Sequence, residues 1–204
     1  MAGMENRELE LKFVVHHPGA MRHAILHLGA EGQGEIREIN YFFDNSEGTL
    51  NSSGRRLRLR RTEHSIITYK ERPEHPLPGV KDMVELETEV TDVDQMRKIL
   101  LRLGFQEVMI YEKYRETFNL GDIQIVLDRM PIGTFMEIEG QRSRILSVSR
   151  RLGLDPDDAI SIGYPEMILI VCQAEGLDSR NCTFELFPES IDPDKYHFPR
   201  MKGR

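Results

Sequence analysis

The stretch from Arg7 to Phe13 alternates charged and apolar side chains with a period of two. Successive side chains of a β-strand point to opposite faces, so this spacing predicts a strand with one apolar and one ionic face. Glu8, Glu10 and Lys12 share the ionic face. Carboxylates with a cation beside them suit a metal or a phosphate, although a single charged strand face is also common on a solvated sheet.

The same alternation recurs along the chain, and recurrence makes the signal stronger than any single strand. In each further run, apolar residues separate the polar and charged ones: Arg56, Arg58 and Arg60; Thr68 and Lys70; Glu85, Glu87 and Glu89; Lys113 and Arg115; Asp128; Glu137 and Glu139. A chain with this pattern is expected to fold into a sheet with one strongly ionic face.

The order of these runs resembles the CYTH superfamily over roughly residues 5–170. The resemblance lies in Glu8-x-Glu10-x-Lys12, Leu57-Arg58-Leu59-Arg60, Thr68-Tyr69-Lys70, Glu85-x-Glu87, Lys113-x-Arg115, Val126-Leu127-Asp128 and Phe135-Met136-Glu137-Ile138-Glu139. That superfamily includes class IV adenylate cyclases, thiamine triphosphatases and inorganic triphosphatases, also called triphosphate tunnel metalloenzymes. The ordered set is far more specific than any one of its pieces.

Periodicity and turn residues predict an α+β fold. Strands are expected at about 7–13, 35–44, 55–61, 65–71, 82–90, 109–119, 122–129 and 134–140. Helices are expected at 18–30, 91–103 and 143–152, with another beginning near Asp157 or Asp158. Eight mostly antiparallel strands can close into a β-barrel that holds a small ligand, here a triphosphate tunnel with covering helices. We assign residues 1–175 to this domain and 176–204 to an irregular C-terminal tail.

The charged faces could line the barrel or could face solvent around an ordinary apolar core. Isolated buried charges cost several kcal/mol each, so charges inside a closed barrel must be paired or must bind ions. A triphosphate with divalent metals would satisfy both sets, because carboxylates bind the metal while arginines and lysines bind phosphate. The resemblance also places these motif positions inside a tunnel, so we favour the inward arrangement.

Composition limits the classes of partner. The net charge of −7 argues against general nucleic-acid binding, where many phosphates must be neutralised. The longest apolar run, from Met167 to Cys172, is far too short to span a membrane, and the N-terminus lacks the apolar core of a signal peptide. Two cysteines form no disulfide framework. We therefore expect a cytoplasmic protein, and the sequence leaves the oligomeric state open, a homodimer included.

The resemblance implies roles for the inward charges. Mg²⁺ or Mn²⁺ would be bound by Glu8, Glu10, Asp128, Glu137 and Glu139. Phosphate oxygens would be bound by Lys12, Arg58, Arg60, Lys70, Lys113 and Arg115, while Glu85 and Glu87 would support the basic residues. Lys12, Glu8 and Glu10 would carry the catalysis. A closed barrel would also make the first and last strands neighbours, so that their carboxylates converge.

Such a site suits two reactions. In hydrolysis, water attacks the terminal phosphorus of tripolyphosphate, a nucleoside triphosphate or thiamine triphosphate; in cyclisation, the ribose 3′-hydroxyl of ATP attacks the α-phosphorus and pyrophosphate leaves. Some class IV cyclases carry His-Phe four residues before the first motif, where this chain has Ala2 and Gly3, which favours hydrolysis. A module that binds a polyphosphate or nucleotide without turnover is a third interpretation.

Overall fold

The structure is a computed structural model that describes residues 7–187 and 191–201. Ala2, Gly3 and parts of the predicted tail lie outside the described residues. Within the described ranges, no helix is both long and apolar enough to cross a membrane.

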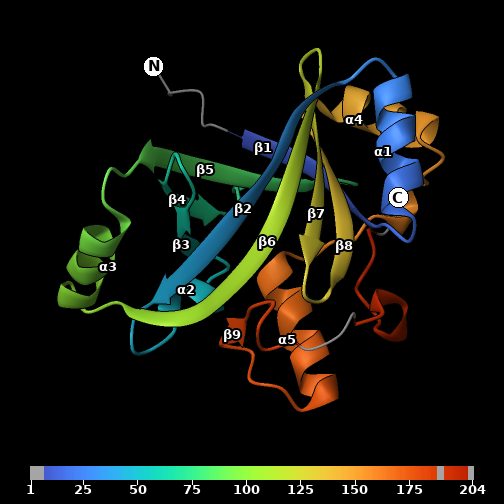
Figure 1. Cartoon of the computed structure of the whole chain (residues 1–204). Helices are drawn as coiled ribbons and strands as arrows, with labels where there is room; N and C mark the ends of the chain where they lie inside the picture. Colours follow the sequence, from blue (N-terminus) through green and yellow to red (C-terminus); the bar gives the residue numbers. More distant parts are fainter. Residues whose placement is uncertain (1–6, 188–190, 202–204) are drawn as a thin grey trace, which may run out of the picture.

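Eight strands form a closed ring (Figure 1). In the order of pairing β2-β3-β4-β5-β1-β8-β7-β6, each strand is antiparallel to the next, and β6 pairs back with β2. Their bounds are β1 (Arg7–Val14), β2 (Glu31–Asp44), β3 (Arg56–Arg61), β4 (Ile66–Glu71), β5 (Lys81–Glu89), β6 (Gln106–Leu120), β7 (Ile123–Met130) and β8 (Gly133–Glu139). The predicted α+β fold with an eight-stranded closed sheet is confirmed.

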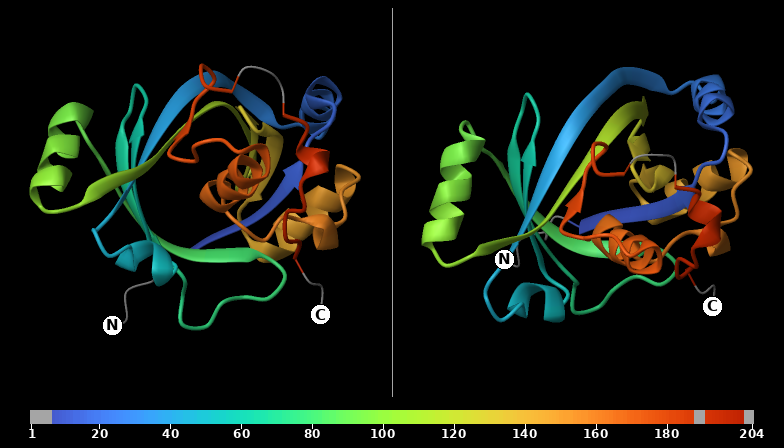
Figure 2. Two further views of the ribbon diagram at one scale, coloured as in Figure 1. Left: turned by 90° about the horizontal axis from the view of Figure 1, so that it is seen from below. Right: turned by 60° about the horizontal axis from the view of Figure 1, so that its bottom comes forward.

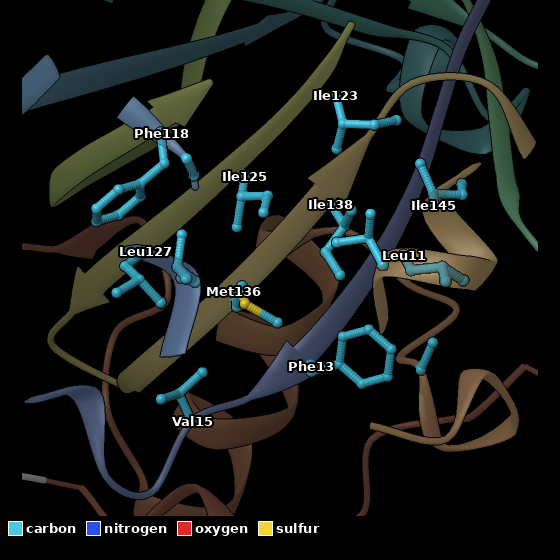
Figure 3. Close-up of a cluster of buried hydrophobic side chains, with 14 of the residues drawn as sticks. Leu11, Phe13, Val15, Phe118, Ile123, Ile125, Leu127, Met136, Ile138 and Ile145 are labelled. Atoms are coloured by element: carbon cyan, nitrogen blue, oxygen red, sulfur yellow. The ribbon is translucent and has the colours of Figure 1, made fainter. Parts of the chain in front are cut away.

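The apolar faces of the strands point outwards and are covered by helices. Leu11 and Phe13 of β1 pack with Met136 and Ile138 of β8 in one buried cluster (Figure 3). The helices α1 (Pro18–His27) and α4 (Arg142–Arg151) contribute Ile25 and Ile145 to this cluster. On the opposite side, α3 (Val93–Arg102) covers the outer faces of β2 and β3. Burying these apolar faces outside leaves the alternate, charged residues inside the ring.

The helix α5 (Tyr164–Glu175) lies across the ring opening rather than on its outer wall (Figure 2). It packs against Phe42, Tyr111 and Phe135, which belong to β2, β6 and β8. Cys172 of α5 and Cys182 are both buried free thiols in this second cluster. An apolar layer therefore closes one end of the charged interior.

The predicted start of this helix near Asp157 or Asp158 is wrong. Those residues form the 3-10 helix η1 (Pro156–Asp158), and α5 begins only at Tyr164. Between the two, the backbone N–H of Ile160 donates to the carbonyl of Lys12 at 2.7 Å, which keeps the segment extended along β1. Sequence periodicity could not show this bridge, because its partner lies at the other end of the chain.

Short elements complete the fold. They are α2 (Thr49–Ser52), the two-residue strand β9 (Asn181–Cys182) and the 3-10 helix η2 (Pro193–Lys195). β9 pairs with β6 in parallel, and Phe187 and Phe198 are buried in the cluster around α5. The described part of residues 176–204 thus packs on the ring, while the domain boundary at 175 stays a prediction.

Gly140 ends β8 beside the predicted site, and alanine should not fit there. Its φ is 146°, and an added Cβ would lie 2.5 Å from Ile123 Cδ1. We expect Gly140→Ala to lower the free energy of unfolding by about 1–3 kcal/mol through overpacking and backbone strain. Gly19→Ala is the control, because it lies in α1 with open space around it and should stabilise by at most ~1 kcal/mol. Urea denaturation measures both; equal stability of Gly140→Ala and the native protein would contradict the prediction.

Candidate functional site

The ring encloses a cavity of about 480 Å³. Every predicted site residue except Asp128 lines it: Glu8, Glu10, Lys12, Arg58, Arg60, Lys70, Glu85, Glu87, Lys113, Arg115, Glu137 and Glu139. These side chains come from six different strands, and ring closure brings them together. Their individual roles stay predictions, but their shared location is a property of the structure.

Strand register decides which charges face each other at the seam of β1. Glu10 lies opposite Lys81 of β5 on one side and Glu139 of β8 on the other. The Lys81 Nζ lies 2.7 Å from a Glu10 carboxylate oxygen. Lys12, opposite Glu137, places its Nζ 3.0 Å from the Glu137 carboxylate and 3.4 Å from that of Glu10. Most carboxylates of this wall therefore already have a cationic partner.

Glu139 is the exception on this wall. Among the residues that the structure describes, none forms an ion pair or hydrogen bond with its carboxylate. Burial, together with the neighbouring carboxylates of Glu8 and Glu10, raises the pKa of Glu139 to about 8. Burial also raises the pKa of Glu85 to about 7, although Lys70 lies 3.0 Å away. The wall built from β1, β5 and β8 is thus short of positive charge.

The arginines of β3, in contrast, have more hydrogen-bond donors than their carboxylate partners use. The guanidinium groups of Arg58 and Arg60 lie 3.5–3.8 Å from their carboxylate partners, longer than a good charge-assisted hydrogen bond. The Nε atoms of both arginines are buried without a hydrogen-bond partner. The positive charge of Arg58 lowers the pKa of Arg60, which shows how closely the two cations are placed. Both side chains have donors to spare for an anion.

Asp128 organises the cations of β6 from beneath the cavity. Its carboxylate is fully buried and accepts hydrogen bonds from Lys113 Nζ at 3.0 Å and from Arg115 Nε at 2.7 Å. Tyr164 Oη of α5 donates to the same carboxylate at 2.8 Å. The carboxylate of Glu38 also forms an ion pair with Lys113, with Oε2 lying 3.3 Å from Nζ. Burial alone would raise the pKa of Glu38, but Lys113 and Arg115 hold it well below the ordinary value.

The expected convergence of carboxylates appears in the strand register but not at chelating distance. In residues 7–187 and 191–201, no three carboxylate, histidine or cysteine side chains are arranged closely enough to hold a metal ion. Glu8 and Glu10 instead accept hydrogen bonds from Lys70 and Lys81, respectively. Asp128 lies outside the cavity lining. Lys70 and Lys81 thus form ion pairs with two of the carboxylates that the resemblance assigns to a metal.

The site also involves Lys81, Glu38, Tyr164 and Glu166, which the sequence did not single out as site residues. Lys81 and Glu38 belong to the same inward alternation as the predicted residues and could have been found from it. Tyr164 and Glu166 lie in the first turn of α5. Glu166 forms an ion pair with Arg56 at the cavity lining. Those two residues could not be placed because no periodicity connects α5 to the ring.

The CYTH domain family model matches residues 6–149 of this chain. A Methanocaldococcus jannaschii protein named "Putative adenylate cyclase" is 23% identical over 172 residues, covering 78% of this chain and 97% of that protein. The matched family region ends before α5, so the Tyr164 and Glu166 contacts lie outside it.

Solved structures show the same fold. A Vibrio parahaemolyticus structure described as "a putative adenylate cyclase" superposes with a TM-score of 0.70 at 22% identity, covering 78% of this chain and 95% of that one. A Hippeastrum protein described as a "putative adenylyl cyclase" that "reveals a dominant" triphosphatase activity has a TM-score of 0.57 at 18% identity, covering 84% and 97%. At these identities the likeness supports the ring architecture alone.

Asp128→Asn tests the buried carboxylate that holds three side chains. Removing the charge leaves Lys113 and Arg115 only their bonds to Glu38 and Glu137, so we expect a loss of about 3 kcal/mol in the free energy of unfolding. The control Asp122→Asn removes an exposed partner of Arg144 and should cost about 0–1 kcal/mol. Urea denaturation compares them, and equal effects of the two variants would contradict a special role for Asp128.

Proposed function

Since the chain belongs to the CYTH domain family, we propose that it is a divalent-metal-dependent enzyme acting on a triphosphate, most simply a triphosphatase. Its substrate would be tripolyphosphate, a nucleoside triphosphate or thiamine triphosphate. One observation carries the proposal: a single cavity joins a wall of cations with unused donors to a wall of carboxylates short of positive charge. A polyanion accompanied by a divalent cation would satisfy both walls at once.

The carboxylate wall fits Mg²⁺ or Mn²⁺ by the chemistry of its donors. All its ligand candidates are carboxylate oxygens, which both ions accept, and Glu139 faces Glu10 with no cation of its own. We assign Glu8, Glu10, Glu137 and Glu139 as the residues that would hold the ion. When bound, such an ion neutralises charge on phosphate oxygens and lowers the pKa of a coordinated water.

Asp128 is better suited to a supporting role. Four donor atoms from Lys113, Arg115 and Tyr164 already engage its two oxygens, and it does not line the cavity. We therefore propose that Asp128 directs cations towards the substrate instead of binding a metal.

The basic residues would bind the phosphate chain and stabilise its transition state. Hydrolysis forms a bond between water oxygen and the terminal phosphorus while the bond to the bridging oxygen breaks, and charge builds on the leaving oxygen. Arg58 and Arg60 on one wall and Lys113 and Arg115 on another can donate to these oxygens from fixed positions. Lys12, which pairs with Glu10 and Glu137, would orient the terminal phosphate or the attacking water.

Adenylate cyclisation is the alternative, favoured by the naming of the Methanocaldococcus jannaschii relative. The same cavity could hold ATP with its ribose 3′-hydroxyl towards the α-phosphorus. Hydrolysis is favoured by the activity described for the Hippeastrum protein. A binding module without turnover is the further alternative, and the complete set of cavity carboxylates argues against it.

A substrate panel separates these functions. Native protein is incubated with ATP, thiamine triphosphate or tripolyphosphate, with Mg²⁺ or Mn²⁺, and phosphate, pyrophosphate and cyclic AMP are measured separately. Triphosphatase activity releases phosphate, whereas cyclic AMP with equimolar pyrophosphate would overturn the proposal in favour of cyclisation. Thermal stabilisation by tripolyphosphate and Mg²⁺ with no product would identify a binding module.

Removing one carboxylate should abolish metal-dependent turnover. We expect Glu10→Gln and Glu139→Gln each to eliminate phosphate release at millimolar Mg²⁺ while circular dichroism shows an intact fold. The control is Glu116→Gln, because Glu116 pairs with Arg22 away from the cavity. Retained activity in both cavity variants at saturating Mg²⁺ would refute the assigned metal ligands.

The arginines of β3 should contribute through the transition state. Replacing Arg58 or Arg60 by alanine should cost ~2–4 kcal/mol in kcat/KM, as is typical for a lost charge-stabilising donor. Stability without ligand should rise or stay level, because the two cations repel each other. Arg61→Ala is the control, since Arg61 on the same strand pairs with Asp94 and does not line the cavity. Near-native kcat/KM, or unfolding of both variants, would instead assign these arginines a structural function.

A further inference from the structure

The first turn of α5 connects two walls of the cavity that are distant in sequence. Tyr164 donates a hydrogen bond to Asp128 on β7, and Glu166 pairs with Arg56 on β3. Both α5 residues line the cavity. This turn is thus tied to the charged interior by specific polar contacts, in addition to the apolar packing along the rest of the helix.

The hydroxyl of Tyr164 acts on the carboxylate that organises the β6 cations. The Oδ2 atom of Asp128 accepts from Tyr164 Oη at 2.8 Å, from Lys113 Nζ at 3.0 Å and from Arg115 at 2.5 Å. A carboxylate shared by several donors can still rotate, and each further bond narrows its orientation. The hydroxyl therefore helps to set where Lys113 and Arg115 point.

The aromatic ring of Tyr164 makes cation–π contacts with Lys12 and Lys113. The Nζ of Lys12 lies 4.1 Å from the ring centroid, and that of Lys113 lies 5.3 Å from it. Both ammonium groups are almost fully buried, so the electron-rich ring face replaces part of their lost hydration. Tyr111 and Phe135 pack against the same ring at 6.2 and 5.7 Å between centroids, which holds it in place.

We propose that Tyr164 is a positioning residue of the phosphate site, holding Lys113 and Arg115 through Asp128 with its hydroxyl and holding Lys12 with its ring. The inference rests on the proposed function, because it assumes that these three cations bind phosphate. It adds a residue outside the matched family region and makes docking of the first turn of α5 a condition for a complete site.

Two substitutions separate the contributions of hydroxyl and ring. Tyr164→Phe removes the bond to Asp128 and keeps the ring, so we expect KM for tripolyphosphate with Mg²⁺ to rise about threefold at little changed kcat. Tyr164→Leu also removes the ring from Lys12, and kcat/KM should fall at least about tenfold, with kcat itself reduced. Calorimetric titration of tripolyphosphate without metal should show the same ranking of affinities.

Tyr196→Phe is the matched control. Tyr196 Oη donates to Glu175 near the other end of α5 at 2.5 Å, and its ring packs in the same region against Phe198. This variant loses a hydroxyl that contacts the same helix outside the cavity, so its kcat/KM and affinity should stay within about twofold of native. Urea midpoints of all variants are measured in parallel.

The outcomes are decisive for each part. Native-like kinetics of Tyr164→Leu, or an equal loss in Tyr196→Phe, would overturn the inference while leaving the proposed function intact. Native-like behaviour of Tyr164→Phe alone would overturn the part played by the hydroxyl, and this variant carries the test if Tyr164→Leu does not fold. Native protein that neither binds nor hydrolyses tripolyphosphate would overturn the proposed function, and the inference with it.

Discussion

Charge buried inside a closed ring must be neutralised, and the interior of this protein is arranged around that requirement. Asp128 has no exposed surface, yet its carboxylate engages two cations and a tyrosine hydroxyl. Lys12 and Lys113, each 1% exposed, have carboxylate partners as well. Removing any one of these groups would leave its buried partners without a counter-charge. Single substitutions in this network should therefore lower the free energy of unfolding.

The charges of the cavity are not fully paired, and the unpaired carboxylates and the unpaired donors lie on different strands. Carboxylate surplus gathers at Glu139 on the seam of β1 and β8, while unused guanidinium donors gather at Arg58 and Arg60 on β3. β3 and β8 lie four places apart in the order of the ring, and no ion pair joins Glu139 to Arg58 or Arg60 among the described residues. A ligand with negative oxygens, accompanied by a divalent ion, would pair with both the carboxylates and the guanidinium donors. The need to neutralise buried charge therefore also determines which ligands the cavity can bind.

Lysines neutralise part of the carboxylate wall. Lys81 bonds Glu10 and Lys70 bonds Glu8, so binding of a divalent ion would require these ammonium groups to give up part of their contacts. Each ion pair offsets part of the cost of burying these carboxylates. At the other end, α5 excludes solvent with an apolar layer while its first turn reaches the ionic interior.

The sequence by itself determined the strands and their two faces, because alternation with period two is a local property of the chain. It also placed Glu8, Glu10, Lys12 and the other cavity charges on the ionic face. Only the tertiary structure decided which charges meet: Glu10 lies between Lys81 and Glu139 through the register of three strands. The tertiary structure also decided that α5 begins at Tyr164 and that the Tyr164 hydroxyl reaches Asp128. These pairings depend on ring closure between distant segments, and no local pattern encodes the register at which distant strands and helices join.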